Sequence, residues 1–262
     1  MSGRASLNLA TIGPGNFEGR LHAAFAADFA AVGLLRTEME REGEAGLEEL
    51  RMSQLAVSEL VGVTGWMDED RTARMVAMAQ AEETFELATR AGCRLVIAYP
   101  TEEPTDTPAA ARSFRELCGL AARQGRCVGL EFTGDHPQVK DLETAWEIVD
   151  AAEAENGGVV IDTFHFWWGE STLAMLEAVP AEKVFLVQVS DCLEMPRRQV
   201  HNRHRVYPGM GAVPLEPLLA ALRGKGYSGY YSLELQNEDY WRENPVTVAR
   251  EGLRAMRRLD II

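Results

Sequence analysis

The sequence is poor in lysine and has no long apolar run. Only three of its 26 basic residues are lysine, and 40 acidic residues give a net charge of −14. A surface that binds nucleic acid needs a basic stripe, which this sequence lacks. No stretch approaches the ~20 consecutive apolar residues that a membrane span requires. We therefore expect neither a nucleic-acid partner nor an association with membranes.

Cysteine is also scarce, and its placement excludes the common cysteine motifs. The four residues are scattered, without a CxxC pair, at Cys93, Cys118, Cys127 and Cys192. Single cysteines within apolar segments are typical of small buried side chains in a reducing compartment. The N-terminal segment also lacks the apolar core of a secretory signal. These features predict a cytoplasmic protein.

A regular alternation of strand and helix patterns fills the chain. Short runs rich in Val, Ile, Leu or aromatic residues predict eight buried strands, at residues 6–13, 33–39, 54–61, 93–100, 127–134, 158–164, 184–191 and 230–236. Helical patterns alternate with them, at residues 17–32, 44–52, 71–92, 109–125, 139–155, 171–179, 214–226 and 246–259. Eight such units predict an α/β fold of the (β/α)8 TIM barrel type.

A doubly wound open sheet is the alternative fold. Such sheets often carry a glycine-rich phosphate loop after the first strand. The corresponding segment here, IGPGNFEG at residues 12–19, lacks the spacing of a GxGxxG or P-loop motif. We therefore expect no nucleotide cofactor and favour the barrel. Because no linker, repeat or low-complexity tract interrupts the chain, residues 1–262 are expected to form a single domain.

Four predicted strands each carry one polar side chain near the C-terminal end. They are Glu131 in VGLEF, Asp162 in VVIDTFH, Gln188 in FLVQVSD and Glu234 in YYSLEL. The steps between them are 31, 26 and 46 residues, and the first two match the length of one strand-plus-helix unit. Parallel strands bring such ends together at one mouth of a barrel, where the side chains can share one ion.

The ligand atoms expected from these four side chains are all oxygens. Such a set suits Mn²⁺ or Mg²⁺, and Co²⁺ or Zn²⁺ are alternatives, although Zn²⁺ more often takes His or Cys ligands. Taken singly, an acid near a strand end is more often a helix cap or half of a salt bridge. Four polar residues that interrupt buried strands near the same end favour binding to a common metal ion instead.

The motifs VGLEF, DTFHFWWG, VQVSDC and YYSLEL resemble those of the xylose isomerase-like barrel superfamily. The sugar phosphate isomerase/epimerase branch, with the 3-dehydroshikimate dehydratases, is the most similar part. The resemblance implies that one divalent ion is held by Glu131, Asp162, Gln188 and Glu234. Many epimerases of the family have His where this chain has Gln188, and Gln there is more typical of the dehydratases.

The same resemblance implies roles for residues around the ion. His165, in a D-x-x-H arrangement, is expected to face the substrate and to carry a proton, since an ordinary pKa near 6.5 suits a general base. Arg205, in the segment RHRVYPGMG, is expected to contact the oxygen-rich end of the substrate, with Arg203 and His204 as alternatives. Met210 stands where the family usually has Glu.

Further candidates rest on weaker patterns. Glu59 and Glu38 close predicted strands and either face the pocket, where Glu59 would bind substrate, or form rim salt bridges and caps. Trp168 is a candidate for substrate contact, and neighbouring aromatic residues could roof the site: Trp66, Phe164 and Trp167. Asp191 could orient Gln188 or His165.

The function that these features predict is metal-dependent isomerisation or epimerisation of a polyhydroxy ketone through an enediolate. Glu131 and Glu234 would act on opposite faces of the reacting carbon, one removing and one returning the proton. The alternative is a lyase similar to 3-dehydroshikimate dehydratase, with His165 carrying the proton. The expected partner is a small polyhydroxy or keto-acid substrate, and a homo-oligomer is possible.

Two other classes fit the sequence less well. A metal-dependent nuclease similar to AP endonuclease IV would need more histidine and aspartate ligands and a basic face, whereas this chain has five histidines and a charge of −14. A non-catalytic barrel subunit would have no reason to keep four polar interruptions in its strands. An enzyme is therefore the preferred interpretation.

Overall fold

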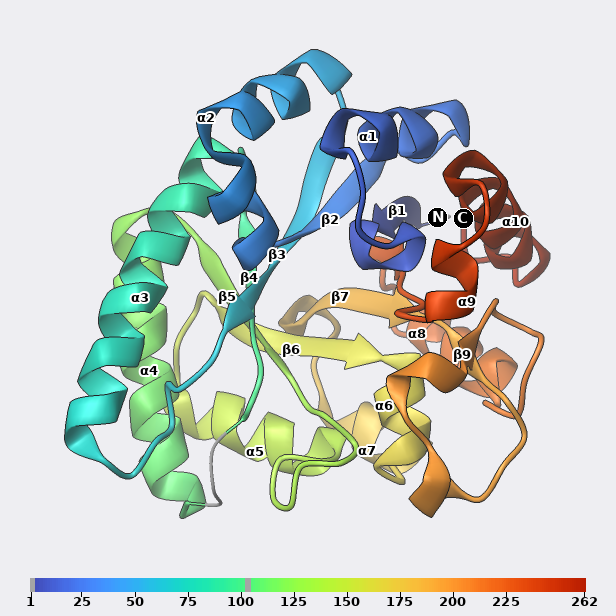
Figure 1. Cartoon of the computed structure of the whole chain (residues 1–262). Helices are drawn as coiled ribbons and strands as arrows, with labels where there is room; N and C mark the ends of the chain where they lie inside the picture. Colours follow the sequence, from blue (N-terminus) through green and yellow to red (C-terminus); the bar gives the residue numbers. More distant parts are fainter. Residues whose placement is uncertain (1–2, 102–104) are drawn as a thin grey trace.

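The computed structural model describes residues 3–101 and 105–262, and a closed barrel of parallel strands forms its centre (Figure 1). The barrel strands are β1 (Arg4–Asn8), β2 (Ala31–Leu35), β3 (Ala56–Val63), β4 (Leu95–Ala98), β5 (Cys127–Glu131), β6 (Gly157–Asp162), β7 (Val184–Val189) and β10 (Tyr230–Leu233). Around the barrel they follow the order β1–β10–β7–β6–β5–β4–β3–β2. This closed order confirms the predicted TIM barrel and excludes the open sheet.

Helices surround the barrel (Figure 1). They are α1 (Phe17–Ala26), α2 (Arg36–Ser53), α3 (Arg71–Arg90), α4 (Thr107–Arg123), α5 (Leu142–Ala152), α6 (Thr163–Trp168), α7 (Leu173–Ala178), α8 (Leu215–Gly224), α9 (Glu238–Trp241) and α10 (Pro245–Arg258). Side-chain caps start several of them, because Asp70, Asp106 and Asp141 accept backbone N–H groups from the first turns of α3, α4 and α5. Among the described helices, none combines the length and apolarity needed to cross a membrane.

The barrel strands are buried on both faces, as their continuous apolar runs require. Every residue of β4 and of β6 is buried. The outward side chains pack against the helices and the inward ones fill the barrel, so no face of these strands is left for water. A charged residue in such a strand therefore needs a partner inside the barrel or at its mouth.

Two predicted strands end earlier in the structure than the sequence suggested. β1 stops at Asn8, because the Asn8 side chain accepts the N–H of Ala10 and begins a 3-10 turn over Leu9–Ile12. β2 stops at Leu35, and α2 follows without a loop. Glu38 therefore lies in the first turn of α2 and not at a strand end, which corrects the sequence-based placement.

The partner of Glu38 also lies away from the barrel mouth. Glu38 forms a buried ion pair with Arg20 of α1, and Arg20 donates a second hydrogen bond to the carbonyl of Leu9 at 2.9 Å. Burial, followed by the nearby charge of Arg41, lowers the pKa of Arg20 to about 10. Of the two roles considered for Glu38, the structural salt bridge is the one observed.

A long segment after β7 returns the chain to the barrel mouth. In it, β8 (Asp191–Cys192) pairs antiparallel with β9 (Arg205–Val206). The Asp191 carboxylate fixes this segment by accepting backbone N–H groups from Cys192, Gly209, Gly211 and Val213. Asp191 thus orders the PGMG turn, and the expectation that it orients Gln188 or His165 is wrong. Met210, within that turn, is exposed.

Candidate metal centre

The strand ends bring the four predicted ligands to one mouth of the barrel. Glu131 is the last residue of β5, and Asp162 is the last residue of β6. Gln188, next to last in β7, is paired in register with Asp162, and Glu234 directly follows β10. All four side chains are buried, and Glu131 and Glu234 line a cavity of about 780 Å³. The spacing argument therefore predicted their common location correctly.

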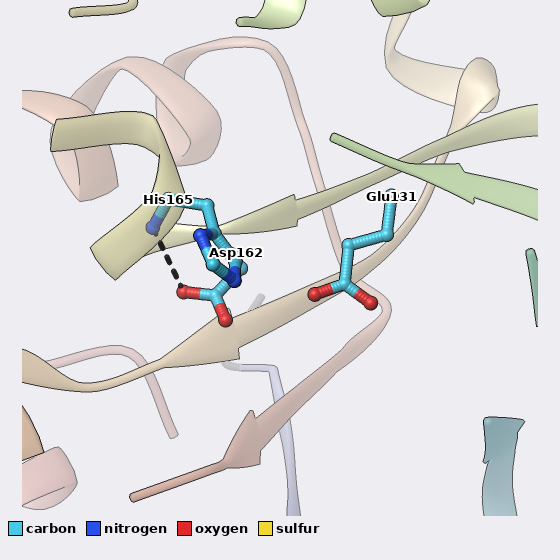
Figure 2. Close-up of side chains that lie close together, drawn as sticks. All are labelled: Glu131, Asp162 and His165. Carbon is cyan, nitrogen blue, oxygen red and sulfur yellow. Dashed lines mark hydrogen bonds between the residues drawn. The ribbon is translucent and has the colours of Figure 1, made fainter. Parts of the chain in front are cut away.

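His165 joins this group because Asp162 caps the short helix α6. Asp162 Oδ1 accepts the backbone N–H groups of Phe164 at 2.7 Å and of His165 at 3.3 Å. Figure 2 shows the result, with Glu131, Asp162 and His165 close together. One ligand atom from each of the three lies within 4.8 Å of the others. The sequence predicted His165 as a proton carrier, and the structure adds it as a possible ligand.

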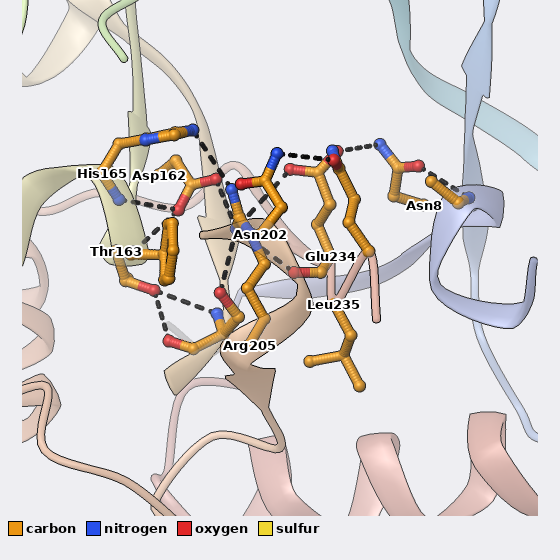
Figure 3. Close-up of polar contacts among 12 residues, drawn as sticks. Asn8, Asp162, Thr163, His165, Asn202, Arg205, Glu234 and Leu235 are labelled. Carbon is orange, nitrogen blue, oxygen red and sulfur yellow. Dashed lines mark hydrogen bonds and ion pairs between the residues drawn. The ribbon is translucent and has the colours of Figure 1, made fainter. Parts of the chain in front are cut away.

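Arg205 lies against these acidic groups and is only 1% exposed. Its Nη1 donates to Asp162 Oδ2 at 2.7 Å and to Ser190 Oγ at 3.0 Å (Figure 3). Its Nη2 is 3.2 Å from His165 Nε2, and the guanidinium carbon lies 4.2 Å from the centre of the Phe164 ring. Arg203, one of the two alternatives named from the sequence, lines the cavity, whereas Arg205 and His204 are not among its lining residues.

Burial and the crowding of negative charge perturb the carboxyl groups unequally. Burial, and then the charges of Glu234 and Asp162, raise the pKa of Glu131 well above its ordinary value. Burial also raises the pKa of Glu234 to about 8, although Arg205 opposes the shift. Burial would raise the pKa of Asp162 as well, but the charge of Arg205 holds it below its ordinary value. Asp162 is therefore the firmly ionised member of the group.

His165 is a weaker base in the structure than its sequence suggested. Burial lowers the pKa of His165 to about 4, although the charge of Asp162 acts in the opposite direction. His165 Nδ1 accepts the N–H of Gly134 at 3.1 Å, and the ring stacks on Trp168 with centroids 5.8 Å apart. The imidazole is therefore neutral at pH 7, the form that can bind a metal or a hydroxyl group.

Unpartnered polar atoms test whether these residues fit a metal ion. Both side-chain atoms of Gln188 and one carboxylate oxygen of Glu234, Oε2, are buried without a hydrogen-bond partner in the described part of the chain. Burying such groups unpaired costs about 1–3 kcal/mol each. Three acids also face a single arginine, Arg205. A divalent cation bound among these oxygens would satisfy Gln188 Oε1, Glu234 Oε2 and the excess negative charge.

Glu59 lies deeper in the barrel than the sequence placed it. β3 continues to Val63, so Glu59 sits in the middle of the strand and is 0% exposed. Its carboxyl group reaches Ser232 Oγ at 2.6 Å and Asn8 Nδ2 at 3.5 Å. Because it has no surface on the cavity, the prediction that Glu59 closes a strand and binds substrate is corrected.

The predicted aromatic residues divide between the core and the mouth. Trp66 is fully buried against Phe114, with ring centroids 5.7 Å apart, so it belongs to the core. Trp168 lines a second cavity of about 640 Å³, and His165 borders both cavities. Trp168 therefore remains a candidate for substrate contact, while Trp66 does not.

Several cavity residues were not singled out from the sequence. Thr133 and Gln236 lie two positions beyond Glu131 and Glu234, and both line the cavity. Their spacing from Glu131 and Glu234 is the sequence feature that could have identified them, since residues two apart in an extended chain point to the same side. No local pattern marked the remaining lining residues, which include Tyr99, His201, Asn202 and Trp241.

Comparison with known proteins agrees with this geometry. A family model described as xylose isomerase-like TIM barrel matches residues 21–259. The chain belongs to this family. An inosose isomerase of Halalkalibacterium halodurans is 39% identical over 129 residues, which are 48% of this chain and 45% of that protein. The chain thus spans about half the length of this relative.

Other members extend the comparison. A 3-dehydroshikimate dehydratase of Pseudomonas aeruginosa is 30% identical over 188 residues, covering 70% of this chain and 30% of that protein. A crystal structure described as the IOLI protein with a bound zinc atom superposes with a TM-score of 0.91. It is 22% identical and covers 98% of both chains, so it supports the fold. The resemblance expected from the motifs is therefore confirmed, including both the isomerases and the dehydratases.

Proposed function

We propose that this protein is a divalent-metal-dependent isomerase or epimerase that acts on a small polyhydroxy ketone. The observation that carries the proposal is the buried amide of Gln188, which has no hydrogen-bond partner in the described chain and lies beside an excess of acids. Glu131, Asp162, Gln188 and Glu234 would hold the ion, and His165 is a possible additional ligand. The ion would supply Lewis acidity, which makes a C–H bond next to a substrate carbonyl more acidic.

The carboxyl groups at the cavity are suited to moving that proton. Glu131 and Glu234 both line the cavity, and burial raises the pKa of each. A carboxyl group with a raised pKa can take up a proton from carbon and return it near neutral pH. The enediolate formed from the substrate would be reprotonated on its opposite face by an epimerase, or on its neighbouring carbon by an isomerase.

The lining of the cavity favours a substrate without a phosphate group. Three acids line it, Glu131, Glu234 and Glu238, whereas Arg203 is the one arginine or lysine among its described lining residues. The ion would balance Glu131 and Glu234, and a single arginine leaves few cationic donors among the described lining residues for a phosphate dianion. Hydroxyl groups instead find acceptors and donors such as Gln236. The similarity to an inosose isomerase supports a neutral keto-polyol of this kind.

Dehydration of 3-dehydroshikimate is the second candidate reaction. The observation that favours it is the glutamine at position 188, because the motif resemblance associates Gln at this position with the dehydratases. The similarity to the Pseudomonas aeruginosa dehydratase also supports this reaction. His165 would then carry the proton to the leaving hydroxyl group. Because burial lowers the pKa of His165 to about 4, His165 holds no extra proton near neutral pH. It would have to receive the proton from a neighbouring acid, and Glu131 lies within reach.

The experiment that tests the proposal is a substrate screen with the metal-loaded protein. Purified protein with Mn²⁺ is incubated with keto-inositols, ketoses, ketose phosphates and 3-dehydroshikimate, and proton exchange with deuterated water is followed by NMR. We expect exchange and conversion with an unphosphorylated keto-polyol. An aromatic product detected by ultraviolet absorbance would instead identify the dehydratase. A protein that binds no Mn²⁺ in a melting assay would contradict both reactions.

The choice of metal is part of the same proposal. The oxygen donors favour Mn²⁺ or Mg²⁺, and the imidazole of His165 also admits Zn²⁺ or Co²⁺. Elemental analysis of the protein as isolated would identify the ion. A cytoplasmic location, a homo-oligomer and a single domain over residues 1–262 remain predictions from the sequence.

A further inference from the structure

Beneath the metal centre, a group of buried polar residues surrounds Glu59. Its Oε1 accepts hydrogen bonds from Ser232 Oγ at 2.6 Å and from Asn8 Nδ2 at 3.5 Å. Its Oε2 is hydrogen-bonded to Ser58 Oγ. These partners come from β10, β1 and β3, so the group crosses the inside of the barrel. Glu59 makes no ion pair in the described part of the chain, and the mechanism above does not use it.

The barrel is built to accommodate this carboxyl group. The pairing of β2 with β3 shifts register, so that Val32 pairs with Val57 but Gly33 pairs with Glu59. Such a bulge breaks the alternation of a strand, and it allows Ser58 and Glu59 to make contacts inside the barrel together. A Cβ atom at Gly33 would overlap Glu59 Oε1. Glycine at this position therefore leaves the space that the carboxyl group occupies.

The hydrogen-bonding atoms around Ser58 allow a protonated Glu59 to complete the group. Ser58 Oγ lies 3.1 Å from the carbonyl of Val32, which can only accept a hydrogen bond. If Ser58 gives its single hydrogen to Val32, the hydrogen between Ser58 and Glu59 must come from Glu59. Ser6 Oγ, 2.5 Å from Ser58 Oγ, can then donate to the remaining lone pair. Burial also raises the pKa of Glu59, although the hydrogen bonds with Ser232, Ser58 and Asn8 act in the opposite direction.

Asn8 connects this group to the metal centre. Its Oδ1 accepts the N–H of Ala10 at 3.0 Å, which fixes the amide so that Nδ2 faces two carboxyl groups. One of these is Glu59, and the other is Glu234, whose Oε1 lies 3.0 Å from Nδ2 (Figure 3). Gln236 Nε2 donates to the same Glu234 oxygen at 3.1 Å. Glu234 Oε1 is therefore occupied, whereas Oε2, which lies 4.0 Å from Arg205 Nη1, has no hydrogen-bond partner among the described residues.

We propose that Glu59 is a neutral, protonated carboxylic acid and a positioning residue that acts through Asn8 to hold Glu234 with Oε2 toward the metal. A neutral Glu59 supports the Asn8 amide without adding a fourth negative charge to the centre. The positioning part rests on the proposed metal role of Glu234. The protonation part does not, since it follows from the contacts of Glu59 itself.

Infrared difference spectroscopy tests the protonation. The spectrum of Glu59→Gln is subtracted from that of the wild type at pH 7. We expect the difference to contain the carbonyl-stretch band of a protonated carboxylic acid. Contributions from Glu131 or Glu234 cancel because both proteins contain them. Absence of the band would show that Glu59 is ionised and would overturn the proposal.

Titration with Mn²⁺ alone tests the positioning. Glutamine reproduces a neutral group with one acceptor and one donor, so Glu59→Gln should bind Mn²⁺ within about a factor of two of the wild type. Glu59→Leu and Asn8→Leu remove the hydrogen bonds, and each should weaken Mn²⁺ binding about tenfold. Because both act through one chain of contacts, the double variant should be weakened little further.

The controls separate this inference from the proposed function. Thr84→Val, in which a buried hydroxyl group of α3 loses its 2.8 Å hydrogen bond to the carbonyl of Gln80, should leave Mn²⁺ binding unchanged. A wild type that binds no Mn²⁺ would contradict the proposed function and, with it, the positioning role. If the wild type and both leucine variants bound Mn²⁺ equally tightly, that result would contradict the positioning role alone. Equal losses in Glu59→Gln and Glu59→Leu would also overturn it.

Discussion

Two buried arginine–carboxylate pairs in this protein differ in the number of acidic groups around the arginine. Between α1 and α2, Arg20 pairs with Glu38 and with a backbone carbonyl. At the barrel mouth, Arg205 pairs with Asp162 at 2.7 Å, but two more acids stand beside that pair. Burial lowers the pKa of Arg20 to about 10. Burial would also lower the pKa of Arg205, but the charges of Asp162 and Glu234 outweigh it and raise that pKa.

The difference separates a structural ion pair from a centre that needs a further cation. A buried ion pair stabilises a fold only when each charge is balanced and hydrogen-bonded. Around Arg20 the charges are balanced by Glu38, although Arg20 Nε and Glu38 Oε2 have no hydrogen-bond partner among the described residues. Around Arg205, Glu131 and Glu234 remain in excess and Gln188 has no hydrogen-bond partner in the described chain. The balance of charge, and not the presence of a salt bridge, identifies the functional region.

The largest effect that distinguishes the two regions should be on turnover. We expect Glu131→Gln and Glu234→Gln each to lower kcat about 10³-fold, because an amide cannot accept the substrate proton. Glu38→Gln, the matched change at the structural pair, should lower the melting temperature and leave the kcat of the folded protein near wild type. Near wild-type rates in both of the first two variants would show that these carboxyl groups are not the acid and base.

Removing each arginine should sharpen the comparison further. Arg20→Met leaves Glu38 with only the exposed Arg41, 3.4 Å away, as its cation, and we expect the free energy of unfolding to fall by about 3 kcal/mol. Arg205→Met removes the cation of Asp162, but Mn²⁺ can replace the lost charge. Urea unfolding with and without Mn²⁺ should therefore show a larger metal stabilisation for Arg205→Met than for Arg20→Met. Equal metal stabilisation of the two variants would remove the distinction between the regions.

Gln188 offers a separate test of the metal centre. Gln188→Leu replaces an amide that has no partner in the described structure with an apolar group of similar size, so the metal-free protein should be at least as stable as the wild type. The same change removes a proposed ligand, and Mn²⁺ binding should weaken about tenfold. Calorimetric titration and thermal melting measure the two effects. A loss of metal-free stability with unchanged Mn²⁺ binding would assign Gln188 a structural role.

The smallest expected effect is on the pH dependence of the metal-free protein. Burial raises the pKa of Glu234 to about 8 in the folded state, whereas the unfolded chain releases that proton near the ordinary value. The folded state therefore binds more protons between these values, and its stability falls as pH rises. We expect the melting temperature to decline from pH 6.5 to 8, above the range in which His165 titrates. Glu234→Gln should flatten the decline, and an unchanged slope would assign it to other groups.

The sequence allowed the centre to be located but not its internal arrangement. Glu131, Asp162, Gln188 and Glu234 could be predicted because each interrupts a buried strand at the same end. Glu59 looks similar in sequence, yet a bulge in β3 places it inside the barrel. A bulge depends on how two strands pair, which the residues of one strand do not show.

Helix boundaries set another limit. Glu38 follows an apolar run, as the metal-centre acids do, but α2 begins directly after β2 and carries Glu38 to Arg20. The partner of Arg205 was equally hidden, because it lies 43 residues away in the chain. Side-chain pairing across the barrel is set by the position of the loop after β7, and no local pattern encodes it.

The amino-acid sequence by itself determined the barrel, the common location of the strand-end polar residues and the family. It could do so because strand burial and the spacing of strand-plus-helix units are local and periodic. Only the tertiary structure decided which acids share one arginine and which polar atoms lack a partner among the described residues. It also decided how Asn8 links Glu59 to Glu234. Those properties depend on distances between strands, and such distances exist only after the barrel has closed.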